Sequence, residues 1–183
     1  SDQLNLDGES EEIADKLSKQ SMGFSGADIA NICNEASILS VRNNLEVINL
    51  KILENAIDNI ILGPEKKTFR LSNKEREIIA YHEAGHTIMS YFLVNVTSPI
   101  KVSIMPRGKS ALGFSQREMS ENKLKNKDEI LDEICVLLGG RVAEEIYIRN
   151  ITTGASDDIK KLTELAYMYV TIYGMDKEIS IFH

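Results

Sequence analysis

The chain has 183 residues, a formal net charge of −7 and a hydrophobic content of 43%. These values are typical of a globular protein with one or two small domains, and they exclude an intrinsically disordered chain. The acidic balance argues against nucleic-acid binding, which depends on clustered Lys and Arg. No apolar run approaches the roughly 18 residues that a membrane span requires. We therefore expect any membrane anchor of the native protein to lie outside this sequence.

The first part of the chain predicts a small helical domain. A short acidic helix is expected over Glu9–Gln20. Ser25, followed three residues later by Asp28, resembles a capping box and predicts the start of a second helix. Asn49 is the expected N-cap of a third helix, whose apolar residues recur at helical spacing.

A clear stop signal follows the third helix. Gly63 accepts the left-handed conformation that ends helices, and Pro64 cannot continue one. We therefore predict a domain boundary at this point, which divides the chain into residues 1–63 and 64–183.

The second domain opens with a long helix that carries the most informative motif, His82-Glu83-Ala84-Gly85-His86. Because residues four apart lie on one face of a helix, His82 and His86 can direct two imidazoles at one metal ion. Glu83 is then placed to accept a proton from a water molecule, as in the H-E-x-x-H motif of zinc peptidases. The alternative is a pair of ordinary helix histidines, but burying two such rings on an apolar face without a partner would be costly.

A β-hairpin is expected after this helix. Residues 100–104 alternate apolar and polar, Pro106-Arg107-Gly108 predicts a turn, and residues 111–116 form a possible second strand. One interpretation is that the hairpin only covers the core. The other is that one of its edges offers unpaired backbone groups to an extended peptide.

Two more helices complete a mainly α fold with a small β-hairpin. Asn126 and Glu129 predict the start of a helix that runs to about Ile148, and the last helix covers about residues 157–173. Gly139-Gly140, in the middle of the first of these helices, is typical of close packing against a neighbour or of a kink.

A catalytic zinc ion usually has three protein ligands, so the motif requires one more. A motif with a third histidine is excluded, because no His follows His86 before His183. Carboxylates at two places remain as candidates, and spacing alone does not choose among them: Glu144, Glu145, Asp157 and Asp158.

Six stretches extend the comparison from one motif to nearly the whole chain. They are Gly23-Phe24-Ser25-Gly26-Ala27-Asp28-Ile29-Ala30-Asn31 with Asn34-Glu35-Ala36; Gly63-Pro64-Glu65-Lys66-Lys67; Ala80-Tyr81-His82-Glu83-Ala84-Gly85-His86; Met105-Pro106-Arg107-Gly108; Leu138-Gly139-Gly140-Arg141-Val142-Ala143-Glu144-Glu145; and Thr152-Thr153-Gly154-Ala155-Ser156-Asp157-Asp158. With these stretches in this order, the chain resembles the FtsH family of ATP-dependent, membrane-anchored zinc metalloproteases, which includes mitochondrial and plastid AAA proteases.

The resemblance implies a domain organisation. Residues 1–63 correspond to the C-terminal helical lid of an AAA ATPase module, and residues 64–183 to a zinc-peptidase domain that is C-terminally truncated. Gly26 and Ala27 match a segment that lies near bound nucleotide in assembled AAA rings.

The resemblance also implies roles for the site residues. His82, His86 and Asp158 correspond to the ligands of Zn²⁺, and Glu83 to the catalytic base of a metalloendopeptidase. Glu144 falls at a position that suits either a residue behind the ligands or a rival ligand. Asp157 stands where many members have Asn, which adds a competing carboxylate beside Asp158.

Further expectations concern the whole protein. The family degrades unfolded or membrane proteins processively, as a homo- or hetero-hexamer, in protein quality control. It is anchored in the bacterial inner membrane or in a mitochondrial or plastid membrane. This sequence has no G-x-x-x-x-G-K-[ST] loop, so ATP and Mg²⁺ are expected only in the full-length protein. The alternative is a non-enzymatic assembly or chaperone module with a structural or vacant metal site, against which Glu83 argues.

Overall fold

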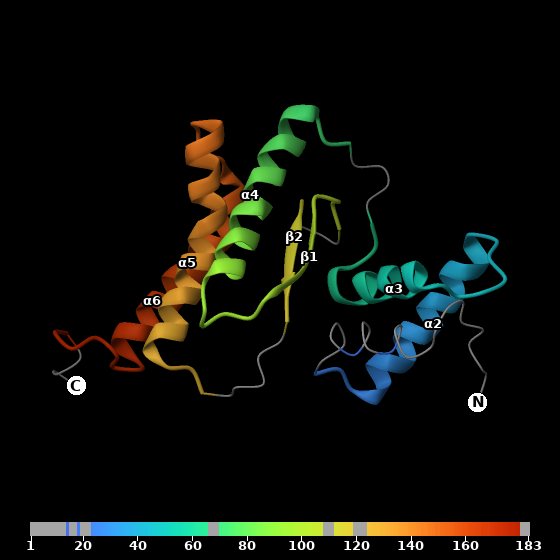
Figure 1. Ribbon diagram of the computed structural model, residues 1–183, viewed down its shortest axis with the longest axis horizontal. Helices are drawn as coiled ribbons and strands as arrows, with labels where there is room; N and C mark the ends of the chain where they lie inside the picture. The colour runs from blue at the N-terminus through green and yellow to red at the C-terminus, as the bar shows by residue number, and fades with distance from the viewer. Residues whose placement is uncertain are drawn as a thin grey trace. The chain divides into compact units, whose positions relative to one another are not determined.

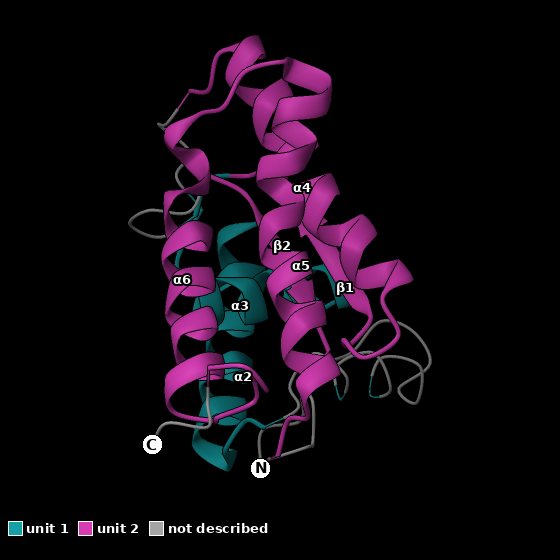
Figure 2. Ribbon diagram, turned by 90° about the vertical axis from the view of Figure 1, so that its left-hand side faces the viewer, with its two compact units in different colours: residues 1–69, 106–111 teal, residues 70–105, 112–183 magenta. Residues whose placement is uncertain are grey.

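The computed structural model describes residues 14, 18, 23–65, 70–107, 112–118 and 124–179. Contacts divide the chain into two compact units: residues 1–69 with 106–111, and residues 70–105 with 112–183 (Figure 2). Residues 106–111, in the middle of the connection between the two strands of the hairpin, thus belong to unit 1, although the strands belong to unit 2. The boundary after residue 63 stays a prediction.

Unit 1 is built on two helices, α2 (Gly26–Arg42) and α3 (Leu50–Leu62). Burial of their facing apolar side chains removes hydrocarbon surface from water and holds the pair together. The buried core consists of Ile32, Ala36, Ile48, Ile52, Leu53, Ala56 and Ile57. The helix predicted over Glu9–Gln20 lies outside the described residues except for Ala14 and Ser18, which are helical.

The ends of these helices confirm the local signals. The Ser25 side chain accepts a hydrogen bond from the backbone N–H of Asp28, and the Asp28 carboxylate accepts one from the Ser25 N–H at 2.8 Å. Asn49 Oδ1 accepts from the N–H of Ile52 at 3.0 Å, and Gly63 ends α3 with a φ of 85°. These side chains satisfy helix-end groups that would otherwise lack a partner.

A buried arginine belongs to unit 1 as well. The Arg107 guanidinium pairs with Asp58 at 3.2 Å and donates a hydrogen bond to Asn59 Oδ1 at 3.0 Å. Both residues of the ion pair are at least 94% shielded from solvent. Removing one partner of such a pair would leave an uncompensated buried charge, which is strongly destabilising. The predicted turn residue is therefore a packing residue of α3.

Unit 2 contains three long helices that run side by side (Figure 1): α4 (Asn73–Phe92), α5 (Lys127–Ala143) and α6 (Ser156–Thr171). Helix α5 packs between the other two. Capping boxes open α4 at Ser72 and α5 at Asn126, as the sequence predicts.

The hairpin covers another side of α4 (Figure 1). Strand β1 (Pro99–Ser103) pairs antiparallel with β2 (Phe114–Arg117), with Val102 opposite Ser115. The Ser115 hydroxyl lies 3.1 Å from that of Thr87 on α4, which ties the sheet to the helix. The prediction of a mainly α fold with a small β-hairpin is confirmed. Among the described residues, no helix has both the length and the apolar character that crossing a membrane requires.

The helix predicted to run to Ile148 is different in its last turn. Regular α-helix ends at Ala143, and Glu144–Ile148 forms a π-helical turn that stops at Arg149, which has a left-handed φ of 55°. A short 3₁₀ turn, Thr153–Ala155, then leads into α6. Periodicity could not reveal this change, because one wider turn leaves the apolar spacing almost unaltered. Such π turns are frequent at functional sites.

We expect Ser72→Ala to destabilise unit 2, because the substitution removes the side-chain acceptor of the α4 capping box. Loss of an N-cap costs about 1 kcal/mol in the free energy of unfolding, measurable by urea unfolding. Asn73→Ala, at the exposed next position, is the matched control. Equal unfolding free energies for the two variants would contradict the assigned cap.

Candidate metal centre

The two histidines lie where α4 approaches α5 most closely. Gly85 of α4 faces Gly139 of α5, and a Cβ atom on Gly85 would overlap the Gly139 carbonyl. The backbones can therefore touch only because both residues lack side chains. This confirms close packing as the reason for Gly139, the first glycine of the pair in α5. It also brings His82 and His86, both buried, against the α5 backbone.

Three side-chain atoms from two helices, all of types that could bind a metal ion, converge at this crossing. The Nε2 atoms of His82 and His86 are 3.0 Å apart. Asp158 Oδ2, from the first turn of α6, lies 3.1 Å from the first Nε2 and 3.3 Å from the second. We call these three residues the His–His–Asp cluster. It is the only group of this kind that the described part of the chain contains.

The outer nitrogen of each ring identifies its tautomer. His86 Nδ1 lies 2.7 Å from the carbonyl oxygen of Val136, which can only accept, so Nδ1 carries the hydrogen and donates it. His82 Nδ1 lies 2.7 Å from Glu144 Oε1, and it donates to that carboxylate in the same way. In the neutral rings, both Nε2 atoms therefore present lone pairs toward the cluster.

The donor set fits a zinc ion. Two imidazole lone pairs and a carboxylate oxygen facing one another at 3.0–3.3 Å repel unless a positive charge lies among them. In tetrahedral zinc sites with bonds near 2.0–2.1 Å, neighbouring ligand atoms lie roughly 3.3 Å apart. The spacing and chemistry of the cluster thus correspond to three corners of such a tetrahedron.

The pKa shifts of the cluster also favour a positive charge among the three residues, as a zinc ion would supply. Burial disfavours the protonated His82 ring, but hydrogen bonds with Asp158 and Glu144 outweigh it and hold the pKa of His82 above its ordinary value. Burial also opposes ionisation of Asp158, yet its contacts with both rings hold the pKa of that carboxyl well below its usual range. The cluster therefore stabilises positive charge. Burial raises the pKa of Glu83, and the two rings oppose this only in part.

Glu144 is not one of the three residues of the His–His–Asp cluster but contacts its first ring from the outer side. It is 1% exposed, its Oε1 accepts from His82 Nδ1, and its Oε2 accepts from the N–H of Thr152 at 2.8 Å. One carboxylate thus joins a ring on α4 to the segment that leads into α6. The π-helical turn begins at Glu144. π-Helical turns are frequent at functional sites, and this one contacts the His–His–Asp cluster through its first residue.

The structure separates the remaining candidates from the cluster. Asp157 is exposed and pairs with Lys161 at 2.7 Å, and Glu145 is exposed on the π-helical turn. Gly26 and Ala27 begin α2 in unit 1, both exposed, and their nearness to nucleotide stays a prediction. His183 lies outside the described residues.

The sequence analysis did not predict the contacts that four residues make at the site: Val136, Thr152, Gly113 and Gly140. The first two act through backbone groups, which carry no residue-type signal. A Cβ on Gly113, just before β2, would lie 2.8 Å from Glu83 Oε1. The start of β2 therefore passes directly over the carboxylate of the motif.

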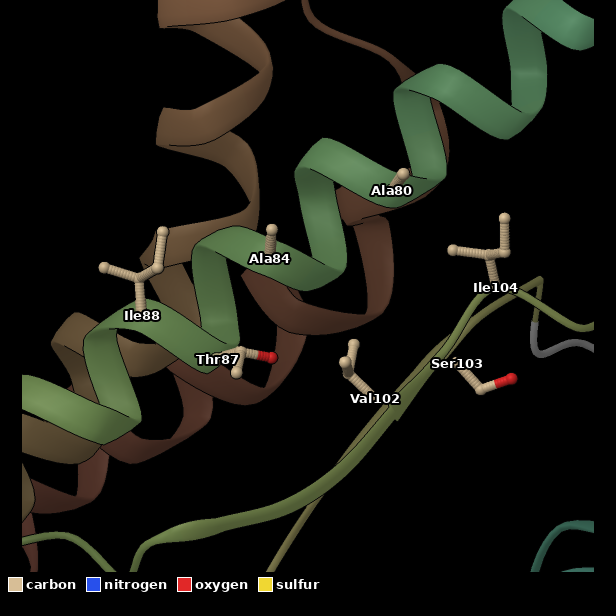
Figure 3. A pocket seen from close by; sticks show the side chains of 7 residues that line it. All are labelled: Ala80, Ala84, Thr87, Ile88, Val102, Ser103 and Ile104. Carbon is tan, nitrogen blue, oxygen red and sulfur yellow. The ribbon is translucent and has the colours of Figure 1, made fainter.

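A separate groove runs along another side of α4 (Figure 3). The groove is lined by α4 and by residues 102–104, of which Val102 and Ile104 point toward α4 and Ser103 points away. None of the lining residues belongs to the His–His–Asp cluster. The lining residues are Ala80, Ala84, Thr87, Ile88, Val102, Ser103 and Ile104.

Comparisons with known proteins agree with this organisation. Residues 69–183 match the model of peptidase family M41, and residues 11–55 match that of the AAA+ lid domain. The chain is 45% identical over 178 residues to the mitochondrial inner membrane m-AAA protease component AFG3L2 of Mus musculus, covering 96% of this chain and 22% of that protein. It is 46% identical over 163 residues to the ATP-dependent zinc metalloprotease FtsH of Rhodothermus marinus, covering 89% and 23%.

The fold, the cluster and these matches define a peptidase domain of the metalloprotease class, joined to an AAA+ lid. The chain belongs to peptidase family M41, and its resemblance to FtsH-type AAA proteases is confirmed. It spans 22% to 23% of the length of these two relatives.

We expect Glu144→Ala to destabilise the protein strongly. The substitution leaves the buried His82 Nδ1–H and the partly buried Thr152 N–H without an acceptor, and an unsatisfied buried group costs about 1–3 kcal/mol. Glu145→Ala, at the exposed next position, should change the free energy of unfolding by less than about 0.5 kcal/mol. Urea unfolding of both variants measures the difference, and similar values for the two would contradict the bridging role.

Proposed function

We propose that this chain carries the zinc-dependent peptidase site of an ATP-dependent protease that degrades unfolded or membrane proteins processively. The observation that carries the proposal is the convergence of three lone-pair donors beside a buried glutamate. The printed names of the relatives, which include ATP-dependent zinc metalloproteases from bacteria and mitochondria, support it.

In this proposal His82, His86 and Asp158 hold the zinc ion. When bound, zinc acts as a Lewis acid that polarises the scissile carbonyl and activates water at neutral pH. Glu83 accepts a proton from the attacking water on its carboxylate and passes it to the nitrogen of the leaving amine. Glu144 and the Val136 carbonyl fix the two rings in the tautomer that leaves each Nε2 free to bind.

We further propose that the free edge of β2 binds the substrate. β1 pairs with one edge of β2, and within the described residues the sheet has only these two strands. Because Gly113 lies against Glu83, a peptide added to the other edge would run past the base. Backbone pairing binds extended chains with little dependence on their sequence, which suits unfolded polypeptides as substrates.

The remaining functions are proposed for the full-length protein. ATP and Mg²⁺ bind there, in an AAA module whose lid is unit 1, and the protein assembles as a homo- or hetero-hexamer. A membrane anchor outside this sequence holds it in the bacterial inner membrane or in a mitochondrial or plastid membrane. No role in nucleic-acid binding is proposed.

The role of Glu83 separates this proposal from a non-enzymatic assembly or chaperone module. In the full-length hexamer, Glu83→Gln should reduce casein digestion by at least about 100-fold, because a general base contributes 10²–10⁴ in rate. The same variant should retain zinc by elemental analysis, whereas His82→Ala or His86→Ala should lose both zinc and activity. Digestion at the parental rate by Glu83→Gln would contradict the role assigned to Glu83, whereas a parent hexamer that does not digest casein would favour the non-enzymatic alternative.

The two neighbouring aspartates offer a matched test of the third ligand. Asp158→Ala should lower zinc affinity at least tenfold, since it removes an oxygen 3.1 Å from His82 Nε2. Asp157→Ala should leave zinc affinity unchanged, because that side chain is exposed and pairs with Lys161. Zinc content measured against a competing chelator gives both values. Equal zinc retention by the two variants would contradict the ligand set.

A further inference from the structure

Helix α5 presents a regular row of contacts to the two histidines. Val136 and Gly140, four residues apart, lie on one face of α5, and Glu144, four residues further on, directly follows the helix and begins the π-helical turn. The ends of this row anchor the two rings: the Val136 carbonyl accepts from His86 Nδ1, and Glu144 accepts from His82 Nδ1. Gly140 is midway between the anchors.

At Gly140 the two rings lie directly against the backbone of α5. A Cβ atom there would be 2.5 Å from His86 Nε2, 2.6 Å from His82 Cε1 and 2.7 Å from His82 Nε2. Such distances are shorter than the contacts that real Cβ atoms make. Backbone conformation gives no other reason for glycine, because Gly140 lies inside α5 and does not have a positive φ. A helix-interior glycine costs about 1 kcal/mol relative to alanine.

The rings have little freedom to move away from an added methyl group. Turning either ring would break its Nδ1 hydrogen bond, both of which measure 2.7 Å. Moving both rings outward would separate the Nε2 atoms from each other and from Asp158. The third possibility, a shift of α5, would carry the Val136 and Glu144 anchors with it. Each response alters the geometry of the three ligand atoms.

We propose that Gly140 is a positioning residue for the metal ion: its missing side chain lets the rings anchored at Val136 and Glu144 bring their Nε2 atoms to 3.0 Å. The inference rests on the proposed function, since it assumes that the cluster binds zinc. It adds a residue that touches neither metal nor substrate but sets the separation of two ligands.

The adjacent Gly139 provides a control for ordinary helix packing. A Cβ on Gly139 would meet the Gly85 carbonyl oxygen at 2.7 Å and Met89 Cγ at 2.9 Å, and its nearest contacts include neither ring. Gly139 therefore serves the approach of α4 to α5, whereas Gly140 serves the histidines. A second control is Gly26, where an added Cβ meets nothing within 4 Å.

The experiment compares Gly140→Ala, Gly139→Ala and Gly26→Ala in the full-length hexamer. Zinc affinity is measured by competition with a chelator, and ATP hydrolysis and hexamer formation report an intact assembly. We expect Gly140→Ala to lose at least tenfold in zinc affinity, the range seen when residues supporting metal ligands are changed, while ATP hydrolysis persists. Gly139→Ala should lower the melting temperature whether or not the two rings are present, because its Cβ meets α4 rather than the histidines. Gly26→Ala, which is compared by zinc affinity and melting temperature only, should change neither.

A second comparison applies even if Gly140→Ala does not assemble. In the His82→Ala/His86→Ala background the rings are gone, so adding Gly140→Ala should no longer lower the melting temperature. A melting temperature that falls equally with and without the rings would overturn the inference, as would parental zinc affinity in Gly140→Ala. A parent protein that binds no zinc would instead contradict the proposed function itself, which separates the two failures.

Discussion

The contact between the backbones of α4 and α5 is the constraint on which the site depends. Gly85 and Gly139 allow the two helices to approach without side chains between them. Because the helices are in backbone contact, the main-chain carbonyl of Val136 on α5 can accept a hydrogen bond from His86 on α4. A larger residue at the crossing would push the helices apart and move the Val136 carbonyl and Glu144 away from the two histidine rings. Packing and chemistry are therefore set by the same few atoms.

Burying so many polar groups is tolerated because nearly every one has a specific partner. Glu144 is almost completely buried, yet both of its oxygens accept hydrogen bonds. Arg107 Nε in unit 1 is buried without a hydrogen-bond partner among the described residues, and the Nε2 atoms and Asp158 differ in that they turn lone pairs toward one another. An arrangement of this kind is unfavourable by itself and becomes favourable with a cation. The facing lone pairs thus coincide with the place where function is proposed, and the surrounding hydrogen-bonded pairs hold them there.

Local chemistry accounts for what could be predicted of the fold. Ser25, Ser72 and Asn126 open helices as expected, because each capping box is a hydrogen-bond exchange within four residues. Gly63 ends α3 for a similarly local reason. The prediction failed for the last turn of α5, where Glu144 begins a π-helical turn. There the decisive contacts, to His82 and Thr152, come from outside the helix.

The sequence by itself determined which helix carries the chemistry. Spacing places His82 and His86 on one face of α4, with Glu83 beside them, whatever the rest of the chain does. Spacing does not choose among the four carboxylates, and only the family resemblance indicates Asp158. The tertiary structure brings Asp158 to the two rings, puts Glu144 beside His82 Nδ1, and leaves Asp157 in solvent. The physical reason is separation along the chain: His82 and Asp158 are 76 positions apart. Their meeting depends on how α4, α5 and α6 pack, and helix packing is decided by the whole of each interface.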